Sequence, residues 1–274
     1  MLHAILLSIT MKAKKSLGQN FLKSKQALRD IVQAGEVTEK DTILEIGPGK
    51  GALTGELLAH GGTVIAIEKD RELITYLSEK FKAEIATKKL LLIEDDILDF
   101  EFSIYKLSAT TYKLIANIPY NITGAIIRKF CEAEQQPERM VLLVQKEVAE
   151  RIVARDKKES ILSISVKAYG TPKIIAKVPA RYFSPAPKVD SAIIAITNIS
   201  KNMFTAVSEQ SFFEIVRSGF AHKRKVLIKN LEEGVSIPKE KLLIIWEQLT
   251  LSPNVRAEEL SLENWGQIVQ KLQD

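Results

Sequence analysis

The stretch TILEIGPGKG, residues 42–51, decides the fold of this chain. Its first half, Thr42–Ile46, is a short apolar run with β-branched residues, which predicts a buried strand. Its second half spaces three glycines as Gly-x-Gly-x-Gly, and the next segment, Ala52–His60, has apolar residues at helical spacing. Glycines at such a strand-to-helix turn let the backbone bend tightly and approach a nucleotide-like ligand. The turn lacks the Gly-Lys-Ser/Thr ending of a P-loop, and alone it also fits a plain strand-to-helix connection.

The same alternation of apolar runs and helical segments extends on both sides of this stretch. Besides Thr42–Ile46, the predicted strands are Thr63–Glu68, Leu90–Glu94, Lys113–Asn117 and Met140–Gln145, with a helix such as Arg71–Lys82 between neighbours. That order predicts an α/β fold, with a parallel sheet and helices on both of its faces. Three later runs without a long helix between them predict an antiparallel edge of the same sheet: Ile161–Tyr169, Lys173–Val178 and Ser191–Thr197.

The last part of the chain has a different pattern, because from about Ser208 its apolar residues recur only at helical spacing. The predicted helices are Phe212–Phe220, Val226–Leu231, Lys239–Leu249 and Leu262–Leu272. We therefore expect an α/β domain over residues 1–198 and a small all-helical C-terminal domain over residues 199–274.

Composition excludes several classes of protein. With 274 residues, 46% of them hydrophobic, the chain can bury a sizeable core, which argues against a small disulfide scaffold or a disordered protein. The single cysteine cannot form an internal disulfide, and the three histidines lie too far apart for a zinc site, so we predict no metal. The apolar start, Met1–Thr10, is too short for a membrane span and lacks the basic beginning of a signal peptide. We expect Met11 to be the natural start of a cytoplasmic protein with no membrane partner.

Basic residues gather in three segments of the chain. The formal net charge is +5, but residues 230–274 hold four bases against eight acids, so the excess lies in residues 1–229. It is concentrated before Asp30, in the run from Lys167 to Lys188, and between Arg217 and Lys229. Basic segments that come together in space are typical of a surface for nucleic acid, whereas ordinary solvated lysines would give the same charge.

Acidic residues end the second and third predicted strands at one edge of the sheet. Glu68 ends one strand, where a carboxylate can accept hydrogen bonds from both hydroxyls of a ribose. Asp95 and Asp96 follow the next, where one acid can accept from an adenine amino group. Together with the turn at Gly47 and Gly49, they predict a site for an adenosine-containing cofactor, and S-adenosylmethionine fits better than a dinucleotide. Each acid alone is also compatible with a solvated strand end.

The fourth predicted strand ends in Asn117-Ile-Pro-Tyr120, the most specific short motif of the chain. Adenine N6 is a poor nucleophile because its lone pair is delocalised into the ring. The Asn117 side-chain oxygen and a nearby backbone carbonyl, such as that of Ile118, can hold its two N–H groups and favour a more tetrahedral nitrogen. Pro119 fixes the turn, and Tyr120 can stack on a base extruded from its neighbours. The simpler interpretation is an Asx-type turn beside a core tyrosine.

A second aromatic candidate lies in the loop Phe183–Ser191, FSPAPKVDS. Two prolines stiffen this loop; we expect Phe183 to form the second wall of a base sandwich opposite Tyr120, and Lys188 to meet a phosphate. A proline-rich loop with a buried phenylalanine explains the same residues equally well.

Five motifs occur in the order KSLGQNFL (Lys15–Leu22), EIGPGKG (Glu45–Gly51), NIPYNIT (Asn117–Thr123), QKEVAER (Gln145–Arg151) and FSPAPKVDS (Phe183–Ser191). As a set they resemble the ribosomal RNA adenine N6-dimethyltransferases of the KsgA type, and they are highly specific. The resemblance runs from about residue 12 to the C-terminus and includes Lys223–Val226 and Arg256–Glu259 in the helical part. The apolar leader before Met11 is not part of the family pattern.

The resemblance implies a Rossmann-like class I methyltransferase domain followed by the helical domain, with S-adenosylmethionine as cofactor. The cofactor-binding positions are then Asn20, Leu22, Gly47, Gly49, Glu68, Asp96 and Asn117, where the spacing to Phe100 favours Asp96 over Asp95, and the catalytic ones are Asn117, Pro119, Tyr120 and Phe183. The implied substrate is a pair of adjacent adenosines in a hairpin loop near the 3′ end of 16S rRNA, in the small-subunit (30S) particle. The product is N6,N6-dimethyladenosine, and we expect a monomer with a role in ribosome biogenesis.

Two other functions stay open at this point. Close relatives dimethylate one adenosine in large-subunit rRNA and confer antibiotic resistance, although the full motif set favours the small subunit. The protein could also act mainly as an RNA-binding assembly factor, or as a transcription-factor-like relative, with a vestigial methylase site. The intact Asn117, Pro119 and Tyr120 argue against that alternative.

Overall fold

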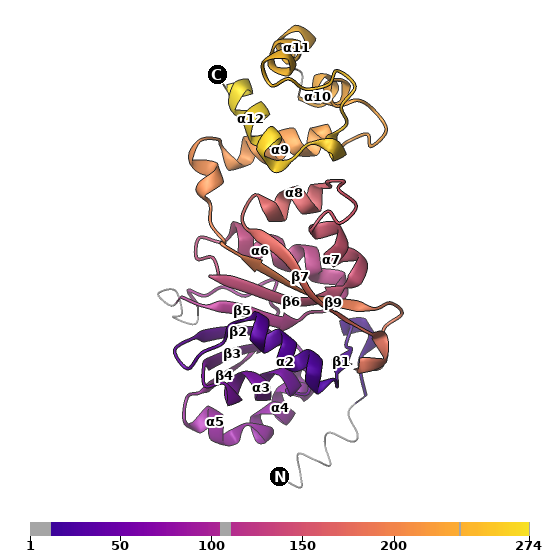
Figure 1. The fold of residues 1–274 in the computed structure, drawn as a ribbon. Coiled ribbons are helices and arrows are strands. Elements are labelled where there is room, and N and C mark those ends of the chain that lie inside the picture. Colours follow the sequence, from indigo (N-terminus) through magenta and orange to yellow (C-terminus); the bar gives the residue numbers. More distant parts are fainter. Residues whose placement is uncertain (1–11, 105–110, 236, 274) are drawn as a thin grey trace. The chain divides into compact units, whose positions relative to one another are not determined.

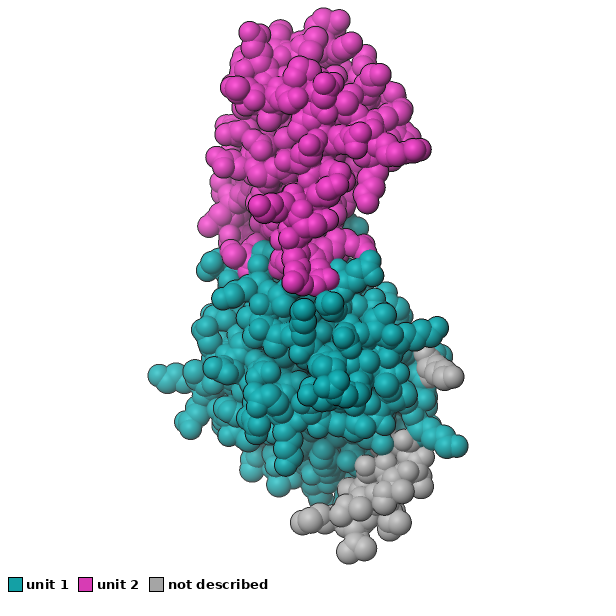
Figure 2. All heavy atoms as spheres, turned by 45° about the vertical axis from the view of Figure 1, so that its right-hand side comes forward, with its two compact units in different colours: residues 1–149, 172–199 teal, residues 150–171, 200–274 magenta. Residues whose placement is uncertain are grey.

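The computed structural model describes residues 12–104, 111–235 and 237–273 of a chain that divides into two compact units. The sheet unit consists of Met1–Ala149 and Pro172–Ile199, and the helical unit consists of Glu150–Thr171 and Ser200–Asp274 (Figures 1 and 2). The helical unit therefore begins earlier in the sequence than the predicted domain over residues 199–274, because it includes residues 150–171.

A seven-stranded sheet forms the centre of the sheet unit, in the order β4-β3-β2-β5-β6-β9-β7 (Figure 1). Its strands are β2 (Thr42–Ile46), β3 (Thr63–Glu68), β4 (Leu90–Glu94), β5 (Lys113–Asn117), β6 (Arg139–Gln145), β7 (Thr171–Val178) and β9 (Ser191–Thr197). The strands from β4 to β6 pair in parallel, and β9 pairs antiparallel with β6. The predicted α/β fold with a mainly parallel sheet is thus confirmed.

The strand order reverses beside β2, because the chain proceeds from β2 to β3 and β4 on one side and then crosses to β5 on the other. In open α/β sheets, ligands bind beyond the carboxyl ends of the strands at such a switch point. The register places Ile46 beside Ile67 and Glu68 beside Glu94, so the carboxyl ends of β2, β3 and β4 meet at one edge.

Helices of the sheet unit bury one face each against a shared apolar cluster; they include α2 (Lys25–Ala34), α3 (Ala52–Ala59) and α4 (Arg71–Lys80). Ile31, Leu57 and Leu77 contribute to this cluster and are at most 1% exposed. The sequence also explains where two of the helices begin. The Ser24 side chain caps α2 and the Asp70 side chain caps α4, each by accepting a backbone N–H of the first turn.

The remaining elements of this unit are shorter or connect the strands. They are η1 (Lys15–Leu17), β1 (Phe21–Leu22), α5 (Lys82–Ala86), η2 (Tyr120–Ile122), α6 (Thr123–Glu132), α7 (Lys146–Ile152, which crosses the boundary between the units), η3 (Ala180–Tyr182) and β8 (Phe183–Ser184). Strands β1 and β8 form a separate antiparallel pair. Two motifs that are far apart in the sequence, KSLGQNFL and FSPAPKVDS, therefore lie side by side.

The segment Ile161–Tyr169, predicted as a strand, is instead helical, and that prediction was wrong. Helix α8 runs over Ile161–Lys167. Ser160 and Ser163 form a reciprocal cap: Ser160 Oγ accepts from the Ser163 N–H at 3.1 Å, and Ser163 Oγ accepts from the Ser160 N–H at 2.7 Å. The β-branched residues of this segment favour a strand only through their surroundings, and here Ile164 is fully buried on a helix face.

The helical unit contains α8 together with α9 (Glu209–Gly219), α10 (Leu227–Val235), α11 (Lys239–Gln248), α12 (Leu262–Gln273) and the short helices η4 (Asn202–Thr205) and η5 (Ala257–Glu259). Phe212, Leu231, Trp246 and Trp265 form much of its core. Gly219 permits close packing of α9 on α12, since a Cβ there would lie 2.3 Å from the Trp265 ring. None of the helices in the described ranges has the length and apolar character needed to cross a bilayer.

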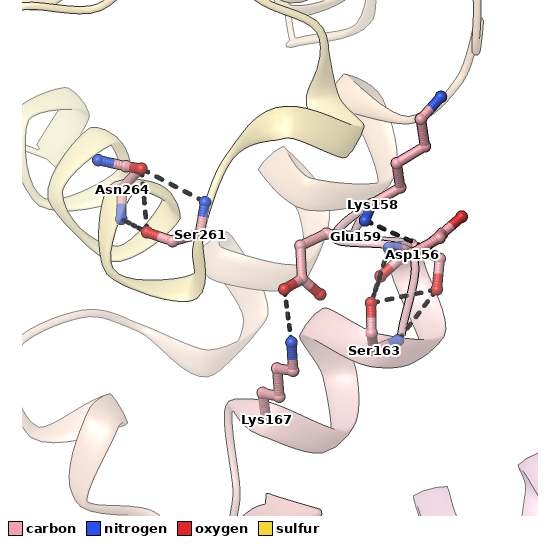
Figure 3. A network of polar contacts seen from close by, with 8 residues as sticks. Asp156, Lys158, Glu159, Ser163, Lys167, Ser261 and Asn264 are labelled. Carbon is pink, nitrogen blue, oxygen red and sulfur yellow. Dashed lines mark hydrogen bonds and ion pairs between the residues drawn. The ribbon is translucent and has the colours of Figure 1, made fainter. Parts of the chain in front are cut away.

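Polar contacts join residues 150–171 to the rest of the helical unit. The Glu159 N–H donates to the Glu258 carbonyl oxygen at 2.8 Å, while the Glu159 carboxylate pairs with Lys167 of the same segment at 2.5 Å (Figure 3). The Tyr169 hydroxyl donates to Glu209 at 2.6 Å. These contacts explain why a segment between two strands of the sheet belongs to the helical unit.

Candidate active site

The sheet unit contains a cavity of about 430 Å³ at the carboxyl ends of its central strands. Its walls come from residues 16–23, from the glycine turn at 45–50, from 67–69 and 95–98 after β3 and β4, and from 117–122 after β5. We call residues 14–23 the N-terminal strap. The structure brings together at this cavity every sequence-predicted site residue except Phe183: Asn20, Leu22, Gly47, Gly49, Glu68, Asp96, Asn117, Pro119 and Tyr120.

The glycine turn between β2 and α3 depends on two close approaches. Gly49 and Gly51 have left-handed backbones, with φ of 59° and 71°. A Cβ on Gly49 would lie 2.9 Å from the Phe21 ring of the strap, and one on Gly51 would lie 2.5 Å from the Phe81 ring. The Lys80 ammonium also holds the turn, because it donates to the carbonyl oxygens of residues 50 and 51 at 2.7 and 3.3 Å. The turn is compact because these glycines carry no side chain.

Glu68 links the glycine turn to the start of α4. It is only 7% exposed, and its Oε2 accepts from the Gly49 N–H at 3.2 Å while its Oε1 accepts from the Asp70 N–H at 2.9 Å. Burial raises the pKa of the Glu68 carboxyl, and the backbone donors act against that shift. Each carboxylate oxygen has a further lone pair, so Glu68 remains an acceptor at the cavity wall.

Both acids that follow β4 line the cavity. Asp96 pairs with the Lys69 ammonium at 2.5 Å and accepts from the Leu98 N–H at 3.0 Å. The hydrogen bond from Lys69 lowers the pKa of Asp96, so this carboxyl is ionised at neutral pH. Asp95 accepts from the Asp96 N–H at 2.8 Å. Because both side chains are held at the wall, the preference for Asp96 as the adenine contact stays a prediction.

Glu45 is a site residue to which the sequence analysis assigns no role. It lines the cavity, it is only 1% exposed, and its Oε2 has no hydrogen-bond partner among the described residues. Burial raises the pKa of the Glu45 carboxyl to about 8, and the nearby Glu68 adds to the shift. Its position at the head of the glycine motif was visible in the sequence. The burial of Glu45 could not be predicted from the sequence, because strand residues alternate in direction and packing decides which of them are buried.

The motif after β5 presents an amide and an aromatic ring to the cavity. Asn117 Nδ2 donates to the Asn20 carbonyl oxygen at 3.1 Å, which orients the amide and leaves its Oδ1 as an acceptor. Pro119 has φ of −58° and precedes η2. The Tyr120 hydroxyl forms a hydrogen bond with the Ser191 hydroxyl, so the hydroxyl end of the ring is held in place. Burial raises the pKa of Tyr120, so the phenol is neutral.

Phe183 lies outside the cavity lining and packs beside the strap. Phe183 of β8 pairs with Leu22 of β1 in the antiparallel register of these two strands, and both side chains belong to one apolar cluster. The Phe183 ring is only 2% exposed. The structure therefore does not present Phe183 as an open wall opposite Tyr120, because the ring is buried in the core of the sheet unit. In this conformation it supports Leu22.

The cavity walls favour a ligand that carries hydrogen-bond donors. Acidic side chains, an amide oxygen and a tyrosine ring converge on it. Within the described ranges, no group of three or more His, Cys, Asp or Glu side chains has an arrangement suited to a metal ion.

Residues 10–274 match the sequence profile of the family described as ribosomal RNA adenine dimethylase. The chain belongs to this family. The family that the five motifs predict is thereby confirmed, and the chain is an S-adenosylmethionine-dependent adenine dimethyltransferase of ribosomal RNA.

Similar proteins support the assignment of this dimethylase along nearly its whole length. "Ribosomal RNA small subunit methyltransferase A" of Dehalococcoides mccartyi is 42% identical over 256 residues, which are 93% of this chain and 87% of the relative. The relative of the same name from Clostridium botulinum is 38% identical over 259 residues, 94% of this chain and 93% of the relative. A crystal structure of a dimethyladenosine transferase from Plasmodium falciparum has a TM-score of 0.79 at 26% identity, covering 92% of this chain and 97% of that one.

The crystal structure of the 23S rRNA methyltransferase ErmE has a TM-score of 0.73 at 23% identity and covers 93% of this chain and 100% of its own. At that identity the likeness shows a shared fold. The dimethylase thus has the predicted class I methyltransferase fold, followed by a helical part.

The cavity of the dimethylase fits the cofactor that its family implies. S-adenosylmethionine carries two cationic groups, a sulfonium and an ammonium, and Glu45 offers the cavity a buried oxygen that lacks a partner within the described chain. Glu68 and Asp96 add further carboxylate oxygens for the donors of an adenosine. Unpaired buried acceptors are costly unless a ligand satisfies them, so this wall suits a ligand rich in donors.

Proposed function

We propose that this dimethylase transfers methyl groups to N6 of two adjacent adenosines in a hairpin loop near the 3′ end of 16S rRNA, giving N6,N6-dimethyladenosine. The observation that carries the proposal is that Asn117 and Tyr120 both line the cavity, with the amide nitrogen of Asn117 held by the Asn20 carbonyl oxygen. The names of the curated relatives support the small ribosomal subunit as the target. The enzyme would then act in the cytoplasm, as a monomer, during ribosome biogenesis.

We infer that one continuous wall holds the cofactor, S-adenosylmethionine, which supplies an electrophilic methyl group when bound. Glu68 would accept hydrogen bonds from the two ribose hydroxyls, and Asp96 would accept from the adenine amino group. The turn at Gly47 and Gly49 would let the backbone approach the methionine part, and the unpartnered oxygen of Glu45 would accept from its ammonium. Charged hydrogen bonds of this kind contribute about 1.5–3 kcal/mol each.

The strap also lines the proposed cofactor site, beside the glycine turn. Asn20 and Leu22 line the cavity, and Asn117 touches the strap through the Asn20 carbonyl oxygen at 3.1 Å. This bond uses the amide nitrogen of Asn117. The amide oxygen of Asn117 is therefore aimed independently of the substrate and is preorganised for it.

The proposed chemistry is alignment of a weak nucleophile. The Asn117 Oδ1 and the Ile118 carbonyl oxygen would accept the two N–H groups of adenine N6, which draws its lone pair out of the ring and toward the methyl group. The methylated nitrogen is acidic and loses its proton readily to water, so no carboxylate base is required. Orientation of reactants can supply several kcal/mol of the barrier, and two acceptors at fixed positions provide it.

The target base must leave its stack to reach the cavity. Tyr120 would stack on the extruded adenine, since its ring lines the cavity and its hydroxyl is anchored on Ser191. Extrusion costs a few kcal/mol, and a hairpin loop lowers that cost because its bases are less tightly paired. This is a physical reason for a loop adenosine as the substrate.

Basic surfaces in both units are proposed to bind rRNA phosphates. Lys173 and Lys177 are exposed on the edge strand β7 of the sheet unit. In the helical unit, Lys223, Arg224 and Lys225 are exposed in the loop between α9 and α10. Such contacts give affinity that falls steeply with salt.

The test is methyl transfer from labelled S-adenosylmethionine to unmethylated small-subunit particles, with large-subunit RNA as the competing substrate. We expect label in small-subunit RNA, and about 10²–10³-fold slower labelling when Asn117 is replaced by alanine. Label confined to large-subunit RNA would reassign the substrate. Binding of both cofactor and RNA without transfer would favour an assembly factor with a vestigial site.

A further inference from the structure

Asp70 is a buried carboxylate next to the cavity but not part of its lining. Its side chain is only 4% exposed, and it lies two residues after Glu68, at the start of α4. As the N-cap of α4, it needs only one bond, the one that its Oδ1 accepts from the Glu72 N–H at 3.1 Å. Its other bonds therefore require a different explanation.

These other bonds all reach the N-terminal strap. Asp70 Oδ1 accepts from the Lys14 ammonium at 2.7 Å, and Asp70 Oδ2 accepts from Gln19 Nε2 at 2.9 Å. The Gln19 Oε1 in turn accepts from the Lys14 N–H at 2.8 Å. Asp70, Lys14 and Gln19 are thus each bonded to the other two, with the Lys14 backbone N–H providing one of the three bonds. The lysine and the glutamine lie five residues apart, so these bonds fix the course of the strap between them.

The backbone of Asp70 reaches the cavity from the other direction. Its N–H donates to Glu68 Oε1 at 2.9 Å, and Glu68 Oε2 holds the glycine turn through Gly49. One residue therefore connects the strap, which carries Asn20 and Leu22, to the carboxylate proposed to bind the ribose.

We propose that Asp70 is a positioning residue for the cofactor site, which fastens the N-terminal strap at the cavity while its N–H orients Glu68. The proposal rests on the proposed binding of S-adenosylmethionine in this cavity.

The Asp70 bonds act together with other contacts of the strap: Leu22 packs in the apolar cluster and the Phe21 ring packs against Gly49. The strap is also held by the two-residue pairing of β1 with β8, by the Asn117 bond to the Asn20 carbonyl and by the Lys23 N–H, which donates to the Tyr182 carbonyl oxygen at 2.8 Å. Ordering a backbone segment costs about 1–2 kcal/mol per residue. If the strap spends only a fraction of its time in place, the apparent cofactor affinity falls by that fraction.

Asp70→Ser separates the fastening from the helix cap. Serine caps a helix about as well as aspartate and keeps the backbone N–H to Glu68, but its short side chain cannot reach Lys14 and Gln19. Lys14→Met breaks the same link from the strap, and Lys14 does not line the cavity. Glu72→Gln is the matched control, because Glu72 also pairs with Lys14, at 3.1 Å, but is 67% exposed.

The experiment measures cofactor affinity by calorimetry and amide hydrogen exchange of residues 14–23 without cofactor. We expect Asp70→Ser and Lys14→Met each to weaken binding of S-adenosylmethionine by about tenfold and to speed exchange in the strap, as a tenfold loss of the closed strap requires. The double variant should bind about as weakly as Asp70→Ser alone, because that substitution already removes the bond that Lys14→Met breaks. Glu72→Gln should bind like the unchanged protein.

Two results would overturn the proposal. Full affinity and unchanged strap exchange in Lys14→Met would mean that the Lys14–Asp70 ion pair does not fasten the strap, and this variant leaves the helix cap intact even if Asp70→Ser fails to fold. Equal weakening by Glu72→Gln would mean that general surface charge matters. If the unchanged protein binds no S-adenosylmethionine, the proposed function fails, while strap exchange still decides whether Asp70 fastens the strap.

Discussion

Two buried polar side chains, one in each unit, hold the segments that carry the proposed functions, and they do so with different electrostatics. In the sheet unit, Asp70 holds the strap as a charged acceptor, with Lys14 at 2.7 Å. In the helical unit, Asn230 is 2% exposed and donates its neutral amide to the carbonyl oxygens of Gly219 at 2.6 Å and His222 at 3.1 Å. The Asp70 carboxylate neutralises the positive charge of Lys14 beside the cavity. The Asn230 amide instead orders the loop between α9 and α10 without neutralising the basic side chains of that loop.

The same contrast holds for the bases of the two segments. Lys14 and Lys69, near the cavity, pair with aspartates. In the loop between α9 and α10, Lys223 and Arg224 are exposed and form no ion pair within the described residues, and only Lys225 pairs with an acid of α10, at 2.8 Å. Charge counted along the sequence therefore overstates what is available to RNA. This difference agrees with the proposed roles of the two segments, in which the cavity binds the cofactor and the loop binds RNA phosphates.

The largest effect that would sharpen this contrast is expected from Asn117→Ala. Turnover should fall by about 10²–10³-fold, because a preorganised acceptor acts mainly in the transition state. RNA affinity should change little, since phosphates supply most of it. Single-turnover methyl transfer and a binding titration measure the two quantities. Equal losses in both would make Asn117 a structural or binding residue.

Charge reversal in the α9–α10 loop should produce the complementary effect. In Lys223→Glu, Arg224→Glu, Lys225→Glu, we expect RNA affinity to fall by about tenfold to a hundredfold and the salt slope to flatten by about one unit per lost phosphate contact. Reversal at Lys225 alone should matter least, because this base is already paired. Cofactor affinity should not change.

A matched control for the loop variant is Lys239→Glu, an exposed base of the same unit outside the loop. It should leave the salt slope unchanged. If the triple variant keeps full affinity and full methylation at physiological salt, the loop is only a solvated surface.

Glu68→Ala should weaken S-adenosylmethionine binding by about tenfold to a hundredfold, because charged hydrogen bonds contribute about 1.5–3 kcal/mol. Glu94→Ala is a matched control, since Glu94 lies beside Glu68 in the sheet register but does not line the cavity. Calorimetry compares the two. Similar affinities in both variants would remove Glu68 from the cofactor site. A changed salt dependence of RNA binding in Glu68→Ala would contradict the separation of cofactor binding from phosphate binding.

A further expected effect concerns pH and Glu45. Its pKa is raised to about 8 by burial, so the folded protein binds this proton more tightly than the unfolded chain does. The stability that the proton provides is full below the unfolded pKa and is lost as pH rises through about 8. Relative to Glu45→Gln, the unchanged protein should therefore lose thermal stability as the pH is raised from 5 to 8. A difference in Tm that is independent of pH would contradict the assignment.

The elements with strong local signals were predictable from the sequence. The glycine turn after Thr42–Ile46 has the predicted strand before it and the predicted helix after it, and the acids that follow the next strands lie at the cavity as expected. These features depend on strand direction and on the general geometry of parallel sheets, which neighbouring residues determine.

The features that were missed depend on packing between distant segments. Ile161–Lys167 has a strand-like composition, and its helix depends on the Ser160 cap and on burial in a unit formed mostly by later residues. Asp70 meets Lys14 and Gln19 across more than fifty residues of chain, and no periodicity indicates such a contact. Phe183 is buried here, as the simpler interpretation of its loop has it, and its contact with a base stays a prediction because an aromatic ring beside prolines does not reveal whether it is buried.

The central claim is that one active site dimethylates adenine N6 in small-subunit rRNA. Nucleoside and fragment mass spectrometry of small-subunit RNA, after reaction of unmethylated particles with labelled S-adenosylmethionine, tests it most directly. We expect N6,N6-dimethyladenosine at two adjacent positions in one hairpin loop near the 3′ end, formed about 10²–10³-fold more slowly by Asn117→Ala. Methylation of another base, of another nitrogen, or of large-subunit RNA in place of this loop would contradict the account.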